Sequence, residues 1–231
     1  MLFYYIRHGE PIYEPDGLTE LGFKQAEALA LKFKHIDFSK IYSSTSNRAI
    51  LTAKPTANAL NKDIIELDFA HEKHPWENLT IDNGNGGKCW LYQMPSIIEL
   101  FNSEEITKLG FKWHEHKLFE DYNYEAEMNR IKNEADQFFL NLGYRHIDNG
   151  KYKIERSNDD KIAMFAHQGF GLAFISAILD IPYPKFSTHF DMGHSSVTVI
   201  EFKEINGYAY PRIITFSNEG HLFKEDIKIT Y

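Results

Sequence analysis

The chain has 231 residues, of which 43% are hydrophobic and 25% are charged, and its formal net charge is −8. This composition is typical of a soluble globular protein and excludes general disorder. The length allows one sizeable core, so we expect a single domain over residues 1–231. Because 25 Lys and Arg stand against 33 Asp and Glu without a basic cluster, we exclude nucleic-acid binding as the main function, whereas a small anionic substrate is compatible.

Cysteine content and hydropathy limit the cellular setting. Cys89 is the single cysteine, so neither an intrachain disulfide nor a thiolate metal cluster can form. The N-terminal run MLFYYIRHGE contains no basic leader, and no apolar run approaches the ~20 residues that a membrane span needs. We therefore expect a cytoplasmic protein with no membrane partner.

The first part of the chain alternates between strand and helix patterns. Leu2–Ile6 is a short apolar run that ends at Arg7, which is typical of a buried strand entering a loop. Thr19 is a candidate N-cap for a helix that ends before His35, because apolar or small residues recur there at helical spacing. The pattern then predicts a strand over Lys40–Ser43, a helix carrying Ala49, Ala53, Ala57 and Leu60, and a strand over Asp63–Leu67.

Between about residues 68 and 120 this periodicity fails. The segment holds all three tryptophans and the cysteine among short polar stretches. We interpret it as an inserted, lid-like segment that selects the substrate. Regularity returns at Tyr124, where apolar residues at helical spacing through Leu142 predict the clearest helix of the chain.

The last part of the chain returns to alternating elements. Lys161–Ala166 predicts a strand that ends at His167, and the apolar stretch Leu172–Leu179 predicts a helix. Two final strands are predicted over Val197–Phe202 and Ile213–Phe216. This order predicts an α/β fold, a three-layer α/β/α sandwich with a mostly parallel sheet and the inserted lid-like segment.

Two predicted strands end in a histidine that is soon followed by glycine, at His8 and His167. Ligands of an open parallel sheet bind beyond the carboxyl ends of its strands, so these histidines meet if their strands are neighbours. Arg7 lies beside His8, and Arg48 lies near the start of the second predicted helix. This set suits phosphoryl transfer, because guanidinium groups hold phosphate oxygens while an imidazole nitrogen attacks phosphorus.

Further motifs follow these residues along most of the chain. They are Arg7-His8-Gly9-Glu10, Leu18-Thr19-Glu20-Leu21-Gly22 with Gln25-Ala26, Ser43-Ser44 with Arg48-Ala49 and Thr52-Ala53, Ala166-His167, and more weakly Asn218, His221 and Leu222. Because it carries these motifs in this order, the chain resembles the histidine phosphatase superfamily, the phosphoglycerate mutase-like group. The longer Glu-Arg-His-Tyr-Gly signature of the mutases is not seen near Glu72, which favours the phosphatase branch.

The resemblance implies specific roles for these residues. His8 would accept the phosphoryl group, and Arg7, Arg48 and His167 would form the phosphate pocket. Glu72 would protonate the leaving oxygen, with Glu77 as the second choice. The family uses no metal, and we expect no cofactor. We thus expect a metal-independent phosphomonoesterase that acts on a small phosphorylated substrate through a phosphohistidine intermediate.

Two other functions remain open. Phosphoglycerate mutase-type transfer is one alternative, because mutases and phosphatases of this family share the phosphate pocket. Pro11 and Glu14 stand where many relatives have threonine and asparagine, so a non-catalytic phosphate-binding module is another alternative. The run from His71 to His74 has i, i+3 spacing rather than the i, i+4 spacing of a zincin helix, and we predict no metal site there.

For six other histidines we expect surface or loop positions: His35, His114, His116, His146, His189 and His221.

Overall fold

The computed structural model describes every residue of the chain and divides the chain into two compact units. Unit 1 comprises Met1–His71, Ser157–Gln168 and Met192–Tyr231. Unit 2 comprises Glu72–Arg156 and Gly169–Asp191. Unit 2 therefore contains most of the predicted insertion, from Glu72 onward, and most of the residues of two longer helices.

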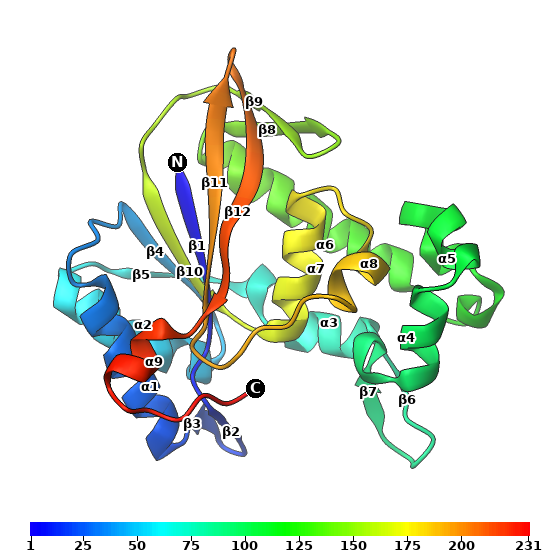
Figure 1. The fold of residues 1–231 in the computed structure, drawn as a ribbon, viewed down its shortest axis with the longest axis horizontal. Helices are drawn as coiled ribbons and strands as arrows, with labels where there is room; N and C mark the ends of the chain where they lie inside the picture. The colour runs from blue at the N-terminus through cyan, green and yellow to red at the C-terminus, as the bar shows by residue number, and fades with distance from the viewer. The chain divides into compact units, whose positions relative to one another are not determined.

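Unit 1 is built on a sheet whose strand order is β5-β4-β10-β1-β11-β12. The first four strands in this order pair in parallel, and β11 and β12 pair antiparallel (Figure 1). The predicted α/β fold with a mostly parallel sheet is confirmed. The strands are β1 (Leu2–Arg7), β4 (Lys40–Ser44), β5 (Ile64–Leu67), β10 (Lys161–Ala166), β11 (Val197–Ile205) and β12 (Tyr208–Asn218).

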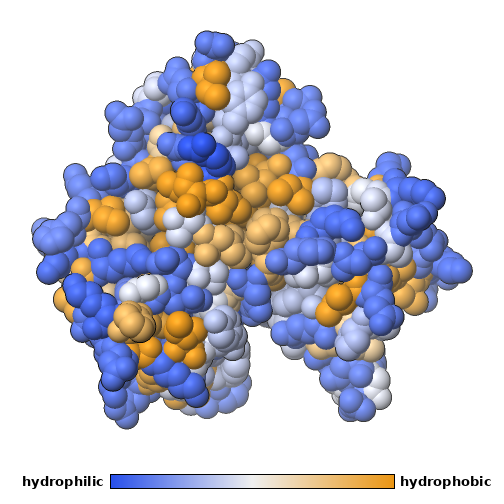
Figure 2. Space-filling view, viewed as in Figure 1, coloured by the Kyte–Doolittle hydropathy of each residue, from blue (hydrophilic) through white to orange (hydrophobic).

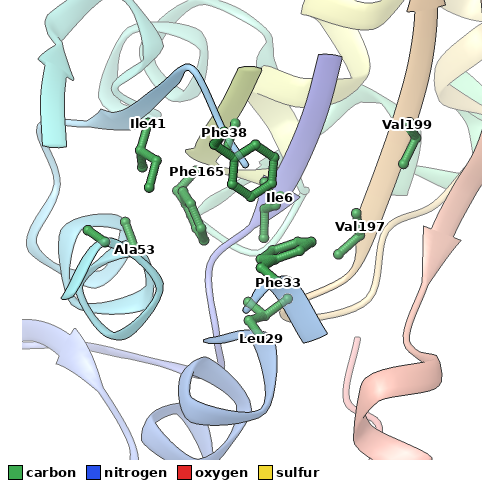
Figure 3. Close-up of a cluster of buried hydrophobic side chains, with 11 residues drawn as sticks. Ile6, Leu29, Phe33, Phe38, Ile41, Ala53, Phe165, Val197 and Val199 are labelled. Atoms are coloured by element: carbon green, nitrogen blue, oxygen red, sulfur yellow. The ribbon is translucent and has the colours of Figure 1, made fainter. Parts of the chain in front are cut away.

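Two amphipathic helices of unit 1 pack against each other and supply apolar side chains to the sheet. In α1 (Glu20–Phe33), the side chain of Thr19 accepts a hydrogen bond from the Gly22 N–H at 3.0 Å, as the predicted N-cap should. The second helix, α2 (Asn47–Leu60), presents its alanine stripe. Figure 3 shows Phe33 of α1 and Ala53 of α2 directed toward Phe165 of β10.

This packing holds the strand ends in place. Phe33, Phe38 and Phe165 are fully buried, and Tyr4 meets the rings of Phe33 and Phe38 edge-on, with centroids 6.1 and 5.1 Å apart. Burying one such side chain contributes about 1.5–3 kcal/mol. The loops that leave the carboxyl ends of the strands are thus mounted on a rigid base.

Unit 1 also contains short elements that the sequence pattern does not predict and two strands that are longer than predicted. A hairpin of β2 (Pro11–Tyr13) and β3 (Asp16–Leu18) follows His8, and strands of three residues are too short to show a period. The two last strands extend several residues further than predicted and form a long hairpin. A 3₁₀ turn, η1 (Asp68–Ala70), and the short helix α9 (Gly220–Lys224) complete the unit. Figure 2 shows apolar residues at the surface where α9 packs on α1.

Unit 2 contains the predicted long helix, α6 (Tyr124–Asn141), followed by a hairpin of β8 (Tyr144–Asp148) and β9 (Lys151–Ile154). An aromatic cluster around the buried ring of Trp113 joins Phe101, Phe119 and Tyr124. The remaining elements are short: α3 (Lys73–Asn78), β6 (Thr80–Asp82), β7 (Lys88–Trp90), η2 (Leu91–Gln93), α4 (Pro95–Phe101), α5 (Glu104–Leu109), η3 (Gly110–Glu115), η4 (Lys117–Phe119) and α8 (Tyr183–Ser187).

The helix after β10 begins earlier than predicted. We expected it to begin at Leu172, but α7 runs from Gln168 to Ile178 and so begins directly after His167. Gly169 and Gly171 lie in its first turn, and their poor helix propensity hides this start from the sequence pattern. In the finished fold, no helix has both the length and the apolar character that crossing a membrane requires.

Candidate active site

The backbone of His8 is fixed at the end of β1. Its N–H donates to the Ala166 carbonyl at 2.9 Å, and its carbonyl accepts from the Ser195 N–H at 3.0 Å. Gly9 follows in such close contact with α1 that a Cβ at this position would lie 2.7 Å from the Gly22 carbonyl oxygen. Only glycine therefore fits at position 9.

The hydrogen bond to the His8 ring sets its tautomer. Nδ1 lies 2.7 Å from the carbonyl oxygen of Gly9, and a carbonyl oxygen can only accept, so Nδ1 carries the proton. Burial lowers the pKa of His8 well below 6.5, and the charges of Arg7 and Arg48 lower it further. The ring is therefore neutral, with the lone pair on Nε2.

His167 lies at the end of β10, which pairs in parallel with β1, and the two imidazole centroids are 5.1 Å apart. The Tyr5 hydroxyl donates to the His167 carbonyl at 2.6 Å and accepts from its N–H at 3.2 Å. The ring nitrogen Nε2 lies 2.8 Å from the Ser44 hydroxyl and 3.2 Å from that of Ser46. The strand-end rule thus correctly predicted that the two histidines meet.

Arg48 lies in the first turn of α2 and is held by the β2–β3 hairpin. One terminal nitrogen, Nη1, donates to the Asp16 carboxylate at 2.8 Å, and the other oxygen of Asp16 accepts from the Asn47 N–H at 2.7 Å. The ring of Tyr13 lies 5.4 Å from the guanidinium carbon. Asp16 and Tyr13 were missed by sequence reasoning, because the short hairpin that brings them to Arg48 carries no periodic signal.

Arg7 is buried at the end of β1, where Nη1 donates to the Met192 carbonyl and Nη2 donates to His194. Burial lowers the pKa of His167 well below 6.5, the nearby His8 lowers it further, and the charges of Arg48 and Arg7 add to this shift. Burial is likewise the largest cause of the low pKa of His8, and the same two charges add to it. Four of the five predicted site residues, all in unit 1, therefore form one cluster. In it, the positive charges of two arginines lie near two neutral imidazoles.

A third histidine, His194, belongs to this cluster and was not singled out from the sequence. Its ring centroid lies 5.7 Å from that of His8, and only 6% of the residue is exposed. Burial and the Arg7 charge lower its pKa to about 3. The segment before β11 carries no motif that points to the site, so only the fold reveals this residue.

Glu72, the predicted proton donor, is the first residue of unit 2. Its carboxylate oxygen Oε1 accepts from the Gly169 N–H at 2.8 Å, and Gly169 begins the second segment of this unit. The ring of Trp90 lies where a Cβ of residue 169 would be, so a glycine is needed there. Glu77, the second choice, is more than half exposed and faces Lys73 at 3.9 Å in α3.

The expected surface or loop position is wrong for His146 in β8 and His221 in α9, whereas His116 lies in a bend between η3 and η4 but is buried. His116 caps a 3₁₀ turn through the Leu118 N–H at 3.2 Å, and the Nε2 atom of His221 lies 3.0 Å from the Ser195 hydroxyl. The side chain of His146 is only 4% exposed and lies between two aspartates. In the run from His71 to His74, where we predict no metal site, His71 lies in unit 1 and His74 lies in α3 of unit 2.

The fold and this cluster define a class of protein: an α/β protein that gathers two arginines and neutral histidines at the carboxyl ends of parallel strands. Comparison with known families agrees with the expected resemblance, because residues 3–85 match the model of the histidine phosphatase superfamily (branch 1). The matched stretch includes Arg7, His8 and Arg48.

Known proteins resemble the chain over different lengths. A 2,3-bisphosphoglycerate-dependent phosphoglycerate mutase of Thermoplasma acidophilum is 40% identical over 70 residues, which are 26% of this chain and 35% of the mutase. The match thus spans about a third of that relative.

Two solved structures show the same fold over nearly the whole chain. A phosphoserine phosphatase from Entamoeba histolytica, in complex with 3-phosphoglyceric acid, has a TM-score of 0.62 at 20% identity and covers 96% of this chain and 98% of its own. A mycobacterial glucosyl-3-phosphoglycerate phosphatase, bound to VO3, has a TM-score of 0.61 at 16% identity, with coverage of 94% and 99%.

Proposed function

We propose that the protein is a metal-independent phosphomonoesterase that hydrolyses a small phosphorylated substrate through a phosphohistidine at His8. The observation that carries this proposal is the hydrogen bond from Nδ1 of His8 to the Gly9 carbonyl, which leaves the Nε2 lone pair for attack on phosphorus. We also propose that the protein belongs to the phosphatase branch of the superfamily and acts in the cytoplasm.

In the proposed first step, a bond forms between Nε2 of His8 and phosphorus while the bond from phosphorus to the substrate oxygen breaks. Arg7, Arg48 and His167 stabilise the charge on the phosphoryl oxygens. Glu72 gives its proton to the leaving alkoxide. In the second step, the Glu72 carboxylate takes a proton from water, which attacks the phosphohistidine and releases inorganic phosphate from a restored His8.

The test is to trap the intermediate. Wild-type protein quenched during turnover of a ³²P-labelled phosphomonoester should carry a label that is labile in acid and stable in base, whereas His8→Ala should carry none. His189→Ala is the matched control, because His189 is an exposed histidine outside the cluster. Full turnover by His8→Ala would overturn the proposed mechanism.

Transfer of the phosphoryl group between positions of one molecule is the second candidate, favoured by the 40% identity of one stretch with a mutase. The two reactions share the phosphohistidine and differ in its acceptor. Labelled phosphoenzyme incubated with 3-phosphoglycerate should release inorganic phosphate if the protein is a phosphatase. Recovery of the label in bisphosphoglycerate would instead favour the mutase, and binding of vanadate without either product would favour a phosphate-binding module.

A further inference from the structure

We propose that His194 is a positioning residue for Arg7 and that Thr230 holds His194 in the tautomer this task requires. The proposal deepens the phosphoryl-transfer function given above and rests on it. It assigns a role to two residues, both in unit 1, that none of the family motifs includes.

The contact between Arg7 and His194 dictates the state of the ring. Nη2 of Arg7 lies 2.8 Å from Nε2 of His194. Because a guanidinium has donors only, Nε2 must accept this hydrogen bond with its lone pair. The proton of the neutral ring is then on Nδ1, where it needs an acceptor of its own.

Thr230 supplies that acceptor. Its hydroxyl oxygen lies 2.9 Å from Nδ1 of His194, and its carbonyl accepts from the backbone N–H of His194 at 2.8 Å. The residue is thus bound to His194 at two points. An Nδ1–H donor facing a threonine oxygen and an Nε2 acceptor facing Arg7 form one consistent hydrogen-bonded chain.

Gln25 of α1 orients Thr230 in turn. The amide oxygen of Gln25 accepts from the Glu10 N–H at 2.7 Å, which turns its amide nitrogen toward the Thr230 hydroxyl at 3.2 Å. Gln25 is fully buried. The hydroxyl oxygen of Thr230 therefore receives two donors, and its position is fixed from a helix of the rigid core.

The consequence is a fixed guanidinium plane. Arg7 is held at Nη1 by the Met192 carbonyl and at Nη2 by His194, which together set both the direction and the rotation of the planar fork. A fork in a fixed orientation matches the phosphoryl oxygens without reorganisation during the reaction. Misplacement of such a group by about 1 Å costs about 100-fold in rate.

The two ring nitrogens can be tested separately, because a glutamine amide reaches about as far as Nε2 and an asparagine amide about as far as Nδ1. His194→Gln keeps an acceptor for Arg7, and we expect a kcat for p-nitrophenyl phosphate within about threefold of wild type. His194→Asn keeps only the contact with Thr230, and we expect kcat to fall by about 10- to 100-fold with little change in thermal midpoint. Thr230→Val, which removes the acceptor for Nδ1, should fall between them.

A double-mutant cycle separates positioning from a merely structural role. In an Arg7→Ala background, His194→Asn should no longer change the affinity for orthovanadate, because the group that it positions is gone. Equal rates for the Gln and Asn variants, or an undiminished effect on vanadate affinity without Arg7, would overturn the proposal. Because vanadate binding needs no turnover, the cycle remains informative if wild type proves inactive, an outcome that would instead contradict the proposed phosphatase activity.

Discussion

The chemistry proposed here depends on the protonation of single side chains, and two of them are fixed by groups that can only donate or only accept. His8 faces a carbonyl at Nδ1, and His194 faces a guanidinium at Nε2. The residue types were readable from the sequence. Their proton positions were not, because the deciding partners are backbone groups or residues far along the chain.

His8 should remain neutral where an ordinary histidine becomes charged. Burial and two arginine charges lower its pKa well below 6.5, so its nucleophilic form should persist as the pH falls from about 8 to about 5.5. In ¹⁵N-labelled protein, the ring signals of His8 should stay constant over this range. The same residue in concentrated urea should titrate near 6.5, which serves as the control. A midpoint near 6.5 in the folded protein would contradict the expectation.

Glu72 should matter in proportion to the basicity of the leaving group. Glu72→Gln keeps the shape of the side chain but removes the transferable proton, so alkyl phosphates should lose about 10²- to 10⁴-fold in the phosphorylation step. An aryl phosphate leaves as a stable anion and should lose much less. Pre-steady-state release of the leaving group is the measurement, because the later hydrolysis also uses the carboxylate.

Two controls accompany this comparison. Glu77→Gln changes the exposed neighbouring carboxylate and should leave both substrates unaffected, whereas Arg48→Ala should slow both because each carries the same phosphoryl charge. Equal losses for both substrates in Glu72→Gln, or a selective loss in Glu77→Gln, would assign the proton donor elsewhere.

At the scale of the elements, helical periodicity predicted the long helices α1, α2 and α6, because their apolar or small residues repeat at a fixed spacing. The strands that lead to His8 and His167 were predicted from short apolar runs. The β2–β3 hairpin and the first turn of α7 were missed, because three-residue strands and glycines carry no such repeat. These missed pieces hold Asp16 and Gly169, which position Arg48 and Glu72.

In unit 2, His146 ties three elements together as a charged ring. Nδ1 lies 2.7 Å from Asp136 of α6, and Nε2 lies 2.9 Å from Asp180, which follows α7 and pairs with Lys132 at 3.7 Å. The ring stacks on Tyr152 of β9 with centroids 4.5 Å apart. Burial lowers the pKa of His146, but hydrogen bonds and charges from both aspartates outweigh it and raise the pKa to about 9.

This tie should stabilise unit 2 at neutral pH and fail at alkaline pH. Because the folded pKa is raised, the contribution is complete below about pH 6.5 and is lost as the pH rises through about 9. His146→Gln should therefore lower the free energy of unfolding by about 3 kcal/mol at pH 6 and by much less at about pH 10. Urea unfolding followed by tryptophan fluorescence reports on this unit, because all three tryptophans lie in it. A pH-independent difference would refute this account.

At the scale of the whole molecule, unit 1 alone gathers the histidines and arginines of the cluster, and the proposed proton donor begins unit 2. We propose that the segment over about residues 68–120 selects the substrate, as its lack of regular pattern suggested. The sequence predicted the family resemblance and the four clustered residues, because these residues lie in local motifs at the ends of β1 and β10 and at the start of α2. It did not predict His194 or Thr230, whose contact with Arg7 depends on how distant segments close around the sheet.

The whole protein should work without a metal, and a metal should harm it. The attacking atom in the proposed mechanism is the Nε2 lone pair of His8, and imidazole nitrogen is also a preferred ligand of Zn²⁺. A bound zinc ion would occupy the lone pair that phosphorus must receive, so phosphate release should survive exhaustive EDTA treatment and should fall when Zn²⁺ is added. Prior incubation with orthovanadate, which occupies the phosphoryl site, should slow the onset of zinc inhibition. Metal analysis of the active protein is the accompanying measurement, and loss of activity in EDTA that one divalent ion alone restores would rule out the metal-independent mechanism.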